Sequence, residues 1–181
     1  MPSKRIDDLD PKVAKLCRTL ISRAEQKGHR IIITMTLRSE AEQLALFAQG
    51  RKALGAVNEL REEAGMLPIT LEQNKICTKN LTSYHQYGRA FDFALLKHGE
   101  NAIEWRTGID LDNNEIPDYN EIGLIAEELG LVWGGRFGET EKGKGDGWDA
   151  CHCQYSTVPL RELREGGNYG VSKVSTVNLE V

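Results

Sequence analysis

The feature that most restricts the fold is a short segment, Arg89–Leu96, whose side chains alternate in character. Phe91, Phe93 and Leu95 alternate with Ala90, Asp92 and Ala94. Successive side chains of a β-strand point to opposite faces, so this pattern predicts a strand with two different faces. One face is apolar and belongs to a core, and the other carries a carboxylate between two small residues. A buried carboxylate without a partner costs several kcal/mol, so Asp92 needs a partner.

The other predicted elements place this strand in an α+β fold. A first helix begins at Pro11 behind the capping residue Asp10 and stops at Gly28. Ser39 and Glu42 form a capping-box pair that opens a second helix. Further helices are expected at 58–64, 120–129 and 159–165, strands at 30–36, 131–133, 148–155 and 171–181, and a mobile glycine-rich loop at 134–147. The predicted architecture is a small antiparallel sheet with helices packed on one side.

Length and charge exclude several classes of protein. The 181 residues fit a single domain, and no apolar run approaches the ~20 residues of a membrane span. With 23 basic and 27 acidic residues, the net charge of −4 gives no support for a nucleic-acid partner. The first residues lack the apolar stretch of a secretory signal, and the four cysteines contain no C-x-x-C pair. We therefore expect reduced thiols and accumulation in the cytoplasm.

Two of the four histidines lie in polar segments that can form one site. His85 precedes Asp92, and Gly88 between them allows the chain to bend. His152 lies in the strand expected at 148–155. Two imidazoles and one carboxylate are a ligand set suited to catalytic zinc, with a fourth position left for water. Either histidine alone also fits a surface or a satisfied core position, whereas the combination favours a metal site.

Asp149 and two cysteines flank His152. In a strand, His152 and Gln154 point to one face while Cys151 and Cys153 point to the other, so the cysteines are expected to pack behind the histidine. Asp149 lies beside the glycine-rich loop and can approach the metal from the side. Metal-assisted hydrolysis needs a carboxylate that takes up a proton and returns it, and Asp149 is the candidate.

Four segments together resemble one family. Residues 83–92 fit S-x-H-x-x-G-x-A-x-D, residues 149–152 fit [DE]-x-x-H, residues 36–51 contain R-S, Q and Q-G-R in order, and residues 129–135 read L-G-L-V-W-G-G. The set resembles the zinc D-Ala-D-Ala carboxypeptidase and L-alanyl-D-glutamate endopeptidase family, which includes phage endolysins. The resemblance covers roughly residues 10–156, and implies one zinc peptidase domain over 1–181 with a C-terminal extension at 157–181.

The resemblance implies a role for each matching residue. The zinc ligands would be His85, Asp92 and His152. Asp149 would be the catalytic base, and Arg38 would hold a substrate carboxylate or the developing oxyanion. Ser83 and Gln43 would lie near the substrate. Without the resemblance, Arg38 is equally a solvated charge in front of a helix.

The implied activity is cleavage of the L-Ala–D-Glu bond of the peptidoglycan stem peptide by a monomer that reaches the cell wall after release from the cytoplasm. The alternatives are a D-alanyl-D-alanine carboxypeptidase, a non-catalytic zinc module such as the related hedgehog signalling domain, and a wall-binding module. The chain departs from the family at Cys151 and Cys153, where proline and an aromatic residue are common. A thiolate at these positions would compete for the metal.

An acidic segment, residues 110–121, spaces its oxygen side chains like a calcium-binding EF-hand loop. These candidate calcium ligands are Asp110, Asp112, Asn114, Asp118 and Glu121. The sixth position of the loop is Glu115 where the turn favours glycine, and no clear helix enters the loop. The alternative interpretation is an acidic turn that caps the following helix.

Overall fold

A computed structural model of the chain describes residues 1–97, 99–138 and 149–165. Its sheet consists of β1 (Ile31–Met35), β2 (Ala90–Leu96), β3 (Ile103–Glu104), β4 (Val132–Trp133) and β5 (His152–Gln154). The strand order is β1-β2-β5-β4, β3 pairs with β2, and every pairing among the described strands is antiparallel. The predicted antiparallel sheet is confirmed, and β3 is an addition that its two residues were too short to indicate.

The described helices agree with the sequence pattern and differ mainly at their ends. They are α1 (Pro11–Gln26), α2 (Glu40–Ala48), α3 (Leu54–Glu63), α4 (Asp118–Glu128) and α5 (Leu160–Arg164), with short 3-10 helices η1 (Ile6–Asp8), η2 (Tyr84–Tyr87) and η3 (Gly134–Arg136). Asp10 caps α1 by accepting the N–H of Lys12, and the Ser39–Glu42 capping box is formed in both directions. Among these elements none is long and apolar enough to cross a membrane.

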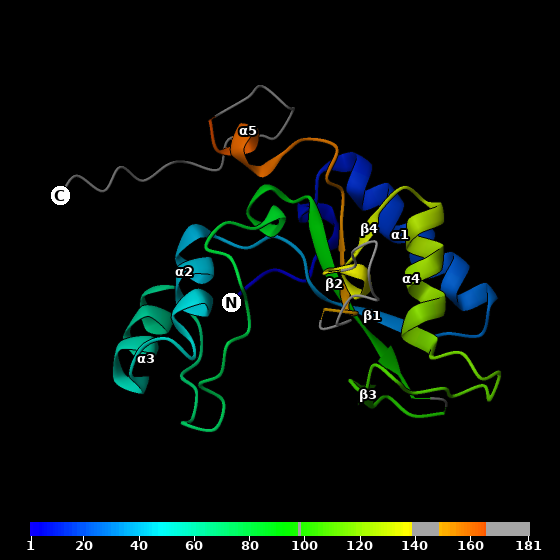
Figure 1. The fold of residues 1–181 in the computed structure, drawn as a ribbon, viewed down its shortest axis with the longest axis horizontal. Helices are drawn as coiled ribbons and strands as arrows, with labels where there is room; N and C mark the ends of the chain where they lie inside the picture. Colours follow the sequence, from blue (N-terminus) through cyan, green and yellow to red (C-terminus); the bar gives the residue numbers. More distant parts are fainter. Residues whose placement is uncertain (98, 139–148, 166–181) are drawn as a thin grey trace.

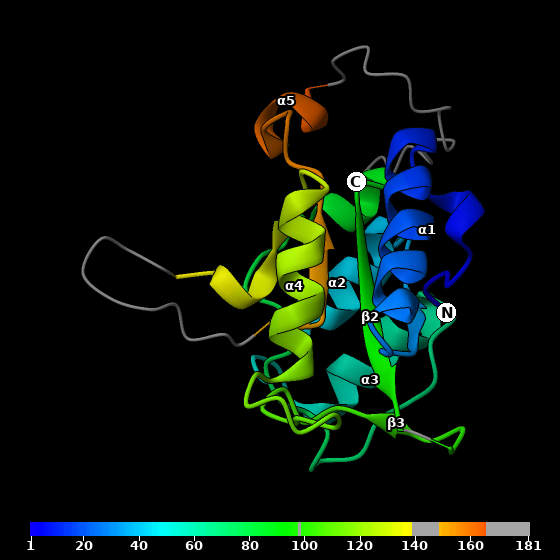
Figure 2. The same cartoon turned by 90° about the vertical axis from the view of Figure 1, so that its right-hand side faces the viewer.

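The core lies between one face of the sheet and the helices α1 and α4. Phe91 and Phe93 of β2 are fully buried there, and Phe93 stacks on Tyr119 of α4 with ring centroids 5.5 Å apart. Figures 1 and 2 show α1 and α4 side by side against this face, while α2 and α3 lie on the opposite side of the sheet. The two-faced strand predicted from the alternation in β2 is therefore confirmed. Its apolar face forms part of the core, and its other face, which carries Asp92, points away from that core.

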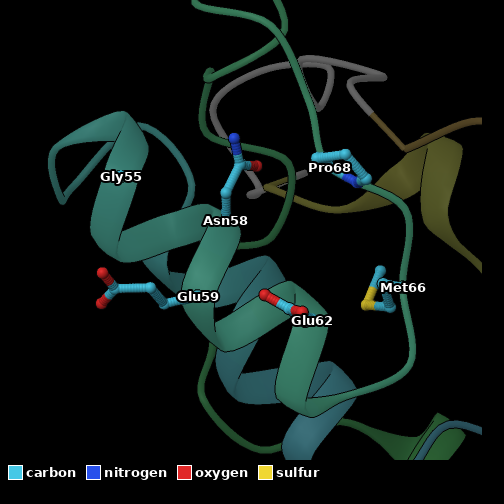
Figure 3. A pocket seen from close by; sticks show the side chains of 6 residues that line it. All are labelled: Gly55, Asn58, Glu59, Glu62, Met66 and Pro68. Atoms are coloured by element: carbon cyan, nitrogen blue, oxygen red, sulfur yellow. The ribbon is translucent and has the colours of Figure 1, made fainter.

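Two further features of the fold lie outside this core. Residues after β5 return over η2, where the hydroxyl of Tyr84 donates to the Val158 carbonyl at 3.0 Å and Leu163 of α5 packs beside Tyr84. A hollow of about 360 Å³ lies beside α3, and Figure 3 shows its lining residues, Gly55, Asn58, Glu59, Glu62, Met66 and Pro68. None of these residues is among the predicted site residues.

One predicted strand is shorter than expected, and two further predictions fall partly or wholly outside the described residues. The strand expected at 148–155 is shorter, because residues 149–151 form a turn and pairing begins at His152. The predicted mobile loop contains η3 at its start, and its remainder at 139–147 lies outside the described residues. The edge strand expected at 171–181 lies outside them as well.

Candidate metal centre

The three predicted ligands meet on the face of the sheet opposite the core. Asp92 of β2 pairs in register with His152 of β5, and η2 brings His85 over both. His85 Nε2 lies 3.3 Å from Asp92 Oδ1 and 3.3 Å from His152 Nδ1, and His152 Nδ1 lies 3.0 Å from Asp92 Oδ1. Both histidines are buried. Residues 67 positions apart in the chain thus place two ring nitrogens and one carboxylate oxygen around a common point.

The hydrogen bonds behind the two rings determine which nitrogens face that point. His85 Nδ1 lies 2.7 Å from the carbonyl oxygen of Thr36, a pure acceptor, so this nitrogen carries the proton. His152 Nε2 lies 3.1 Å from Gln154 Oε1 and donates to it in the same way. The inward nitrogens then have free lone pairs, and they face a carboxylate that offers lone pairs too. In this neutral form three acceptors converge, which either a bound cation or a proton on one ring would satisfy. Outer partners of this kind are typical of histidines that bind metals.

The electrostatics of the cluster favour a bound positive charge. Burial alone would raise the pKa of Asp92, but the charges and hydrogen bonds of His85 and His152 outweigh it and hold the pKa of this carboxyl below its usual range. Burial likewise lowers the pKa of His152, and Asp92 more than reverses this effect. A divalent cation at the same point would satisfy all three ligands, which leaves a tetrahedral ion one open position.

Asp149 lies next to this cluster without belonging to it. Its carbonyl accepts the N–H of His152 at 2.9 Å, and its carboxylate is outside the group of ligand atoms that approach one another closely. Burial raises the pKa of Asp149, with the charge of Asp92 acting in the same direction and that of His152 opposing it. A carboxylate of raised pKa beside an open metal position is suited to carry a proton.

The cysteines lie as the strand pattern predicts. Cys153 is fully buried in the core and Cys151 packs against the same core, while its thiol lies 3.7 Å from Asp149 Oδ1. Burial raises the pKa of both thiols, so they remain protonated. No cysteine belongs to a metal-ligand group in the described part of the chain, which argues against competition by a thiolate.

Arg38 reaches the site from the segment before α2. It is only 7% exposed, and its Nη2 lies 4.0 Å from Asp92 Oδ2. Gln43 fixes this guanidinium, because its Oε1 accepts from Arg38 Nη1 at 2.6 Å while its Nε2 donates to the carbonyl of Asn80 at 2.7 Å. Arg38 Nε is buried without a hydrogen-bond partner among the described residues, so the guanidinium retains donor capacity.

Ser83 has a structural role, as the N-cap of η2, that the sequence did not reveal. Its hydroxyl accepts the N–H of His85 at 3.4 Å, and Gln86 returns a hydrogen bond to the Ser83 backbone, which makes a capping box at the start of η2. Gly88 ends this short helix with φ 62°. Ser83 therefore contacts a metal ligand through the backbone, and its contact with substrate stays a prediction, as does that of Gln43.

Two neighbours of the site were not assigned from the sequence. The ring of Phe137 lies 5.6 Å from that of His152 and covers it from one side. Gln154 orients His152, and the alternation that placed both on one face was the signal that could have identified it. Nothing in the sequence around Phe137 signals its position, because it follows a turn whose direction depends on the packing of Trp133.

The acidic segment 110–121 forms a tight turn that uses its own oxygens. Asp110 accepts the backbone N–H groups of Asn114 and Glu115, and Glu115 adopts φ 69° at the position where glycine is usual. Carboxylates of Asp110, Asp112 and Asp118 approach one another, while Glu121 turns toward His29. Calcium stays a prediction here. Saturable heat in a calcium titration of the zinc-loaded protein would confirm it, and none at millimolar calcium would contradict it.

The antiparallel sheet, the two histidines with one aspartate, the adjacent carboxylate and the buried arginine form an arrangement typical of metal-dependent hydrolases. A family profile described as D-alanyl-D-alanine carboxypeptidase matches residues 77–155, which contain all three ligands and Asp149. The chain is 34% identical over 128 residues to the peptidoglycan L-alanyl-D-glutamate endopeptidase CwlK of Bacillus subtilis. The aligned part is 71% of this chain and 66% of that relative, just under two thirds of its length. The chain is thus similar to peptidoglycan peptidases of this kind, in the same segments as its motifs.

Two solved structures show a likeness to the fold of this chain. The L-Ala D-Glu endopeptidase ChiX of Serratia marcescens is 19% identical, with a TM-score of 0.46 over 82% of this chain and 81% of that chain. The vancomycin-resistance D,D-pentapeptidase VanY, solved in complex with Zn(II), is 16% identical, with a TM-score of 0.45 over 87% of this chain and 76% of that chain.

Proposed function

We propose that this protein is a zinc-dependent peptidoglycan peptidase that hydrolyses the L-Ala–D-Glu bond of the stem peptide. The observation that carries the proposal is the convergence of two imidazole lone pairs and the Asp92 oxygen within 3.3 Å, beside a carboxylate of raised pKa. The similarity to the endopeptidase CwlK supports this choice of bond. His85, Asp92 and His152 would hold Zn²⁺, whose ligand preferences they fit.

Each residue of the site has a separate role in the proposed reaction. Zn²⁺, when bound, polarises the scissile carbonyl and makes a water more acidic. Asp149 accepts the proton of the attacking water and passes it to the leaving amine, for which its raised pKa is suited. Arg38 binds a carboxylate of the stem peptide or the developing oxyanion, and Gln43 holds the guanidinium in place. Phe137 beside His152 limits the access of bulk water.

The substitution Asp149→Asn tests the proposed role of Asp149 as the proton carrier. The substitution keeps the size of the side chain and removes its ability to accept a proton, so we expect the zinc content to stay at the wild-type level. Hydrolysis of purified muropeptides, followed by mass spectrometry, should fall by about 10²–10⁴-fold. His85→Ala and His152→Ala should lose both zinc and activity. Glu128→Gln, which changes an exposed carboxylate in α4, is the matched control. Undiminished hydrolysis by Asp149→Asn would show that the base lies elsewhere.

The same digestion separates the alternatives. Cleavage at L-Ala–D-Glu yields fragments with a new amino terminus on D-Glu, whereas a D,D-carboxypeptidase releases free D-Ala. The family description favours the second activity and the 34% identical relative favours the first. A zinc module or a wall-binding module without catalysis would release neither product.

We further propose that the protein acts as a monomer, accumulates in the cytoplasm and reaches the wall after release. All four cysteines are free thiols in the structure, as a reducing compartment requires. Size-exclusion chromatography with light scattering tests the monomer, and fractionation of producing cells before lysis tests the location. Export of the protein in intact cells would contradict the second point.

A further inference from the structure

A second cluster of metal-ligating side chains lies where the end of α1 meets the start of α4, on the core side of the sheet and away from the peptidase site. His29 follows α1, Glu121 lies in the first turns of α4, and Asp112 comes from the loop before α4. One nitrogen or oxygen from each of these residues lies within 4.8 Å of the others. Figures 1 and 2 show α1 and α4 running together along this flank.

Polar atoms of His29 and Glu121, and of the neighbouring Asp118, are buried without hydrogen bonds, whereas Asp112 is exposed and accepts from Asn114. His29 is 2% exposed and Asp118, beside it, is fully buried. His29 Nε2, Asp118 Oδ2 and Glu121 Oε2 all lack a hydrogen-bond partner among the described residues. Because buried polar groups are nearly always hydrogen-bonded, three such atoms in one place call for a missing partner.

The distances indicate what that partner is. Glu121 Oε2 lies 3.0 Å from His29 Nε2, at ion-pair distance but without the geometry of a hydrogen bond. With a neutral ring, both atoms would offer a lone pair to a cation. Asp118 Oδ2 lies 3.9 Å from His29 Nδ1, beyond hydrogen-bond distance, and adds negative charge beside the ring. Three carboxylates around one imidazole disfavour an anion and favour a cation.

We propose that His29, Asp112 and Glu121 bind a divalent transition-metal ion, with the negative charge of Asp118 beside the ring of His29. The nitrogen ligand distinguishes this site from a calcium loop, in which all ligands are oxygens. Because Asp112 and Glu121 also belong to the predicted calcium set, the two ions would exclude each other. The ion would link α1, α4 and the loop between β3 and α4, and thus hold together the two helices that pack against the sheet. It is independent of the peptidase activity.

Zinc counting on the intact chain tests the proposal. Protein freed of metal with a chelator is equilibrated with Zn²⁺, and bound zinc is measured by atomic emission. We expect two zinc ions per chain in the wild type and one in His29→Gln and in Glu121→Gln. The affinity of the lost site should fall by about 100-fold or more, because removing a residue that merely orients a ligand already costs about 10–100-fold. Glu128→Gln, which changes an exposed carboxylate of the same helix as Glu121, lies outside this group and is the matched control, which should keep two.

Further measurements keep the result interpretable. His152→Ala, which removes a peptidase ligand, should retain one zinc, and His29→Gln should hydrolyse muropeptides at the wild-type rate if the peptidase assignment holds. In wild-type protein loaded with Co²⁺, the ring protons of His29 should show paramagnetic shifts, a readout that needs no variant to fold. A single zinc in the wild type, two in a folded His29→Gln, or unshifted His29 protons would overturn the proposal.

Discussion

Gly134→Ala is predicted to damage the metal centre although it replaces none of the candidate ligands. A Cβ at this position would lie 3.0 Å from the Cβ of His152 and well inside contact distance of the Asp149 carbonyl oxygen. Ordinary contacts begin at 3.4 Å, so the turn that carries Asp149 and His152 must move by roughly 1 Å. The crowding atom is backbone, which cannot rotate away as a flexible side chain can.

The size of the effect depends on that displacement. A shift of about 1 Å in a catalytic group costs about 10²-fold in rate, and overpacking of this kind costs about 1–3 kcal/mol of stability. At roughly 2–4 °C per kcal/mol, the melting temperature should fall measurably. Muropeptide hydrolysis, zinc content and a thermal melt are measured together, so that loss of geometry is distinguished from loss of folded protein.

Gly55→Ala is the matched control for this experiment. Gly55 lies in α3, and an added Cβ there would meet nothing within 4 Å. Alanine in a helix interior is more stable than glycine by about 0.5–1 kcal/mol, so this variant should melt slightly higher and retain full activity. If Gly134→Ala behaved like Gly55→Ala, the argument that Gly134 is needed for close approach to the site would be refuted.

Two more substitutions test how the site is held together. Gln154→Leu removes the acceptor of His152 Nε2, so zinc affinity should fall by about 10–100-fold in a competition titration with a chelator, and an unchanged affinity would contradict the assigned ring orientation. Leu163→Ala removes a buried side chain that packs beside Tyr84, so denaturant unfolding should show a loss of about 2–4 kcal/mol, and a loss below about 0.5 kcal/mol would show that α5 does not support η2.

The fold was predictable from the sequence where one local pattern determined it. The alternation in β2 assigned Phe91 and Phe93 to the core and Asp92 to the other face, and the caps of α1 and α2 marked their beginnings. The length of β5 was not predictable in this way. Residues 149–151 form a turn that lies against Gly134 and accepts a hydrogen bond from Trp133 at the Ala150 carbonyl, contacts that no local pattern indicates.

The candidate ligands of the site could be indicated from the sequence, and their mutual geometry could not. Residue types, spacing and the family resemblance pointed to His85, Asp92 and His152, which the fold brings together. The carbonyl of Thr36 that fixes His85 belongs to a residue whose side chain has no part in the interaction, so no sequence pattern reveals it. The cluster around His29 is a similar case, because its members come from three segments that only the packing of α1 against α4 brings together.

The cysteines beside His152 fit the environment that the structure gives those two positions. Cys153 fills a space in the core that is fully closed to solvent, and its raised pKa keeps it a small apolar side chain. Cys151 reaches the core and the carboxylate of Asp149 together, where a protonated thiol supplies weak hydrogen-bond donation and no charge. A proline at 151 would lack both the thiol and the backbone N–H, yet His152 would still be held by Asp92 and Gln154. The chemistry of the metal centre therefore depends on the partners of the histidine rings, and the residues behind them vary within the limits that volume sets.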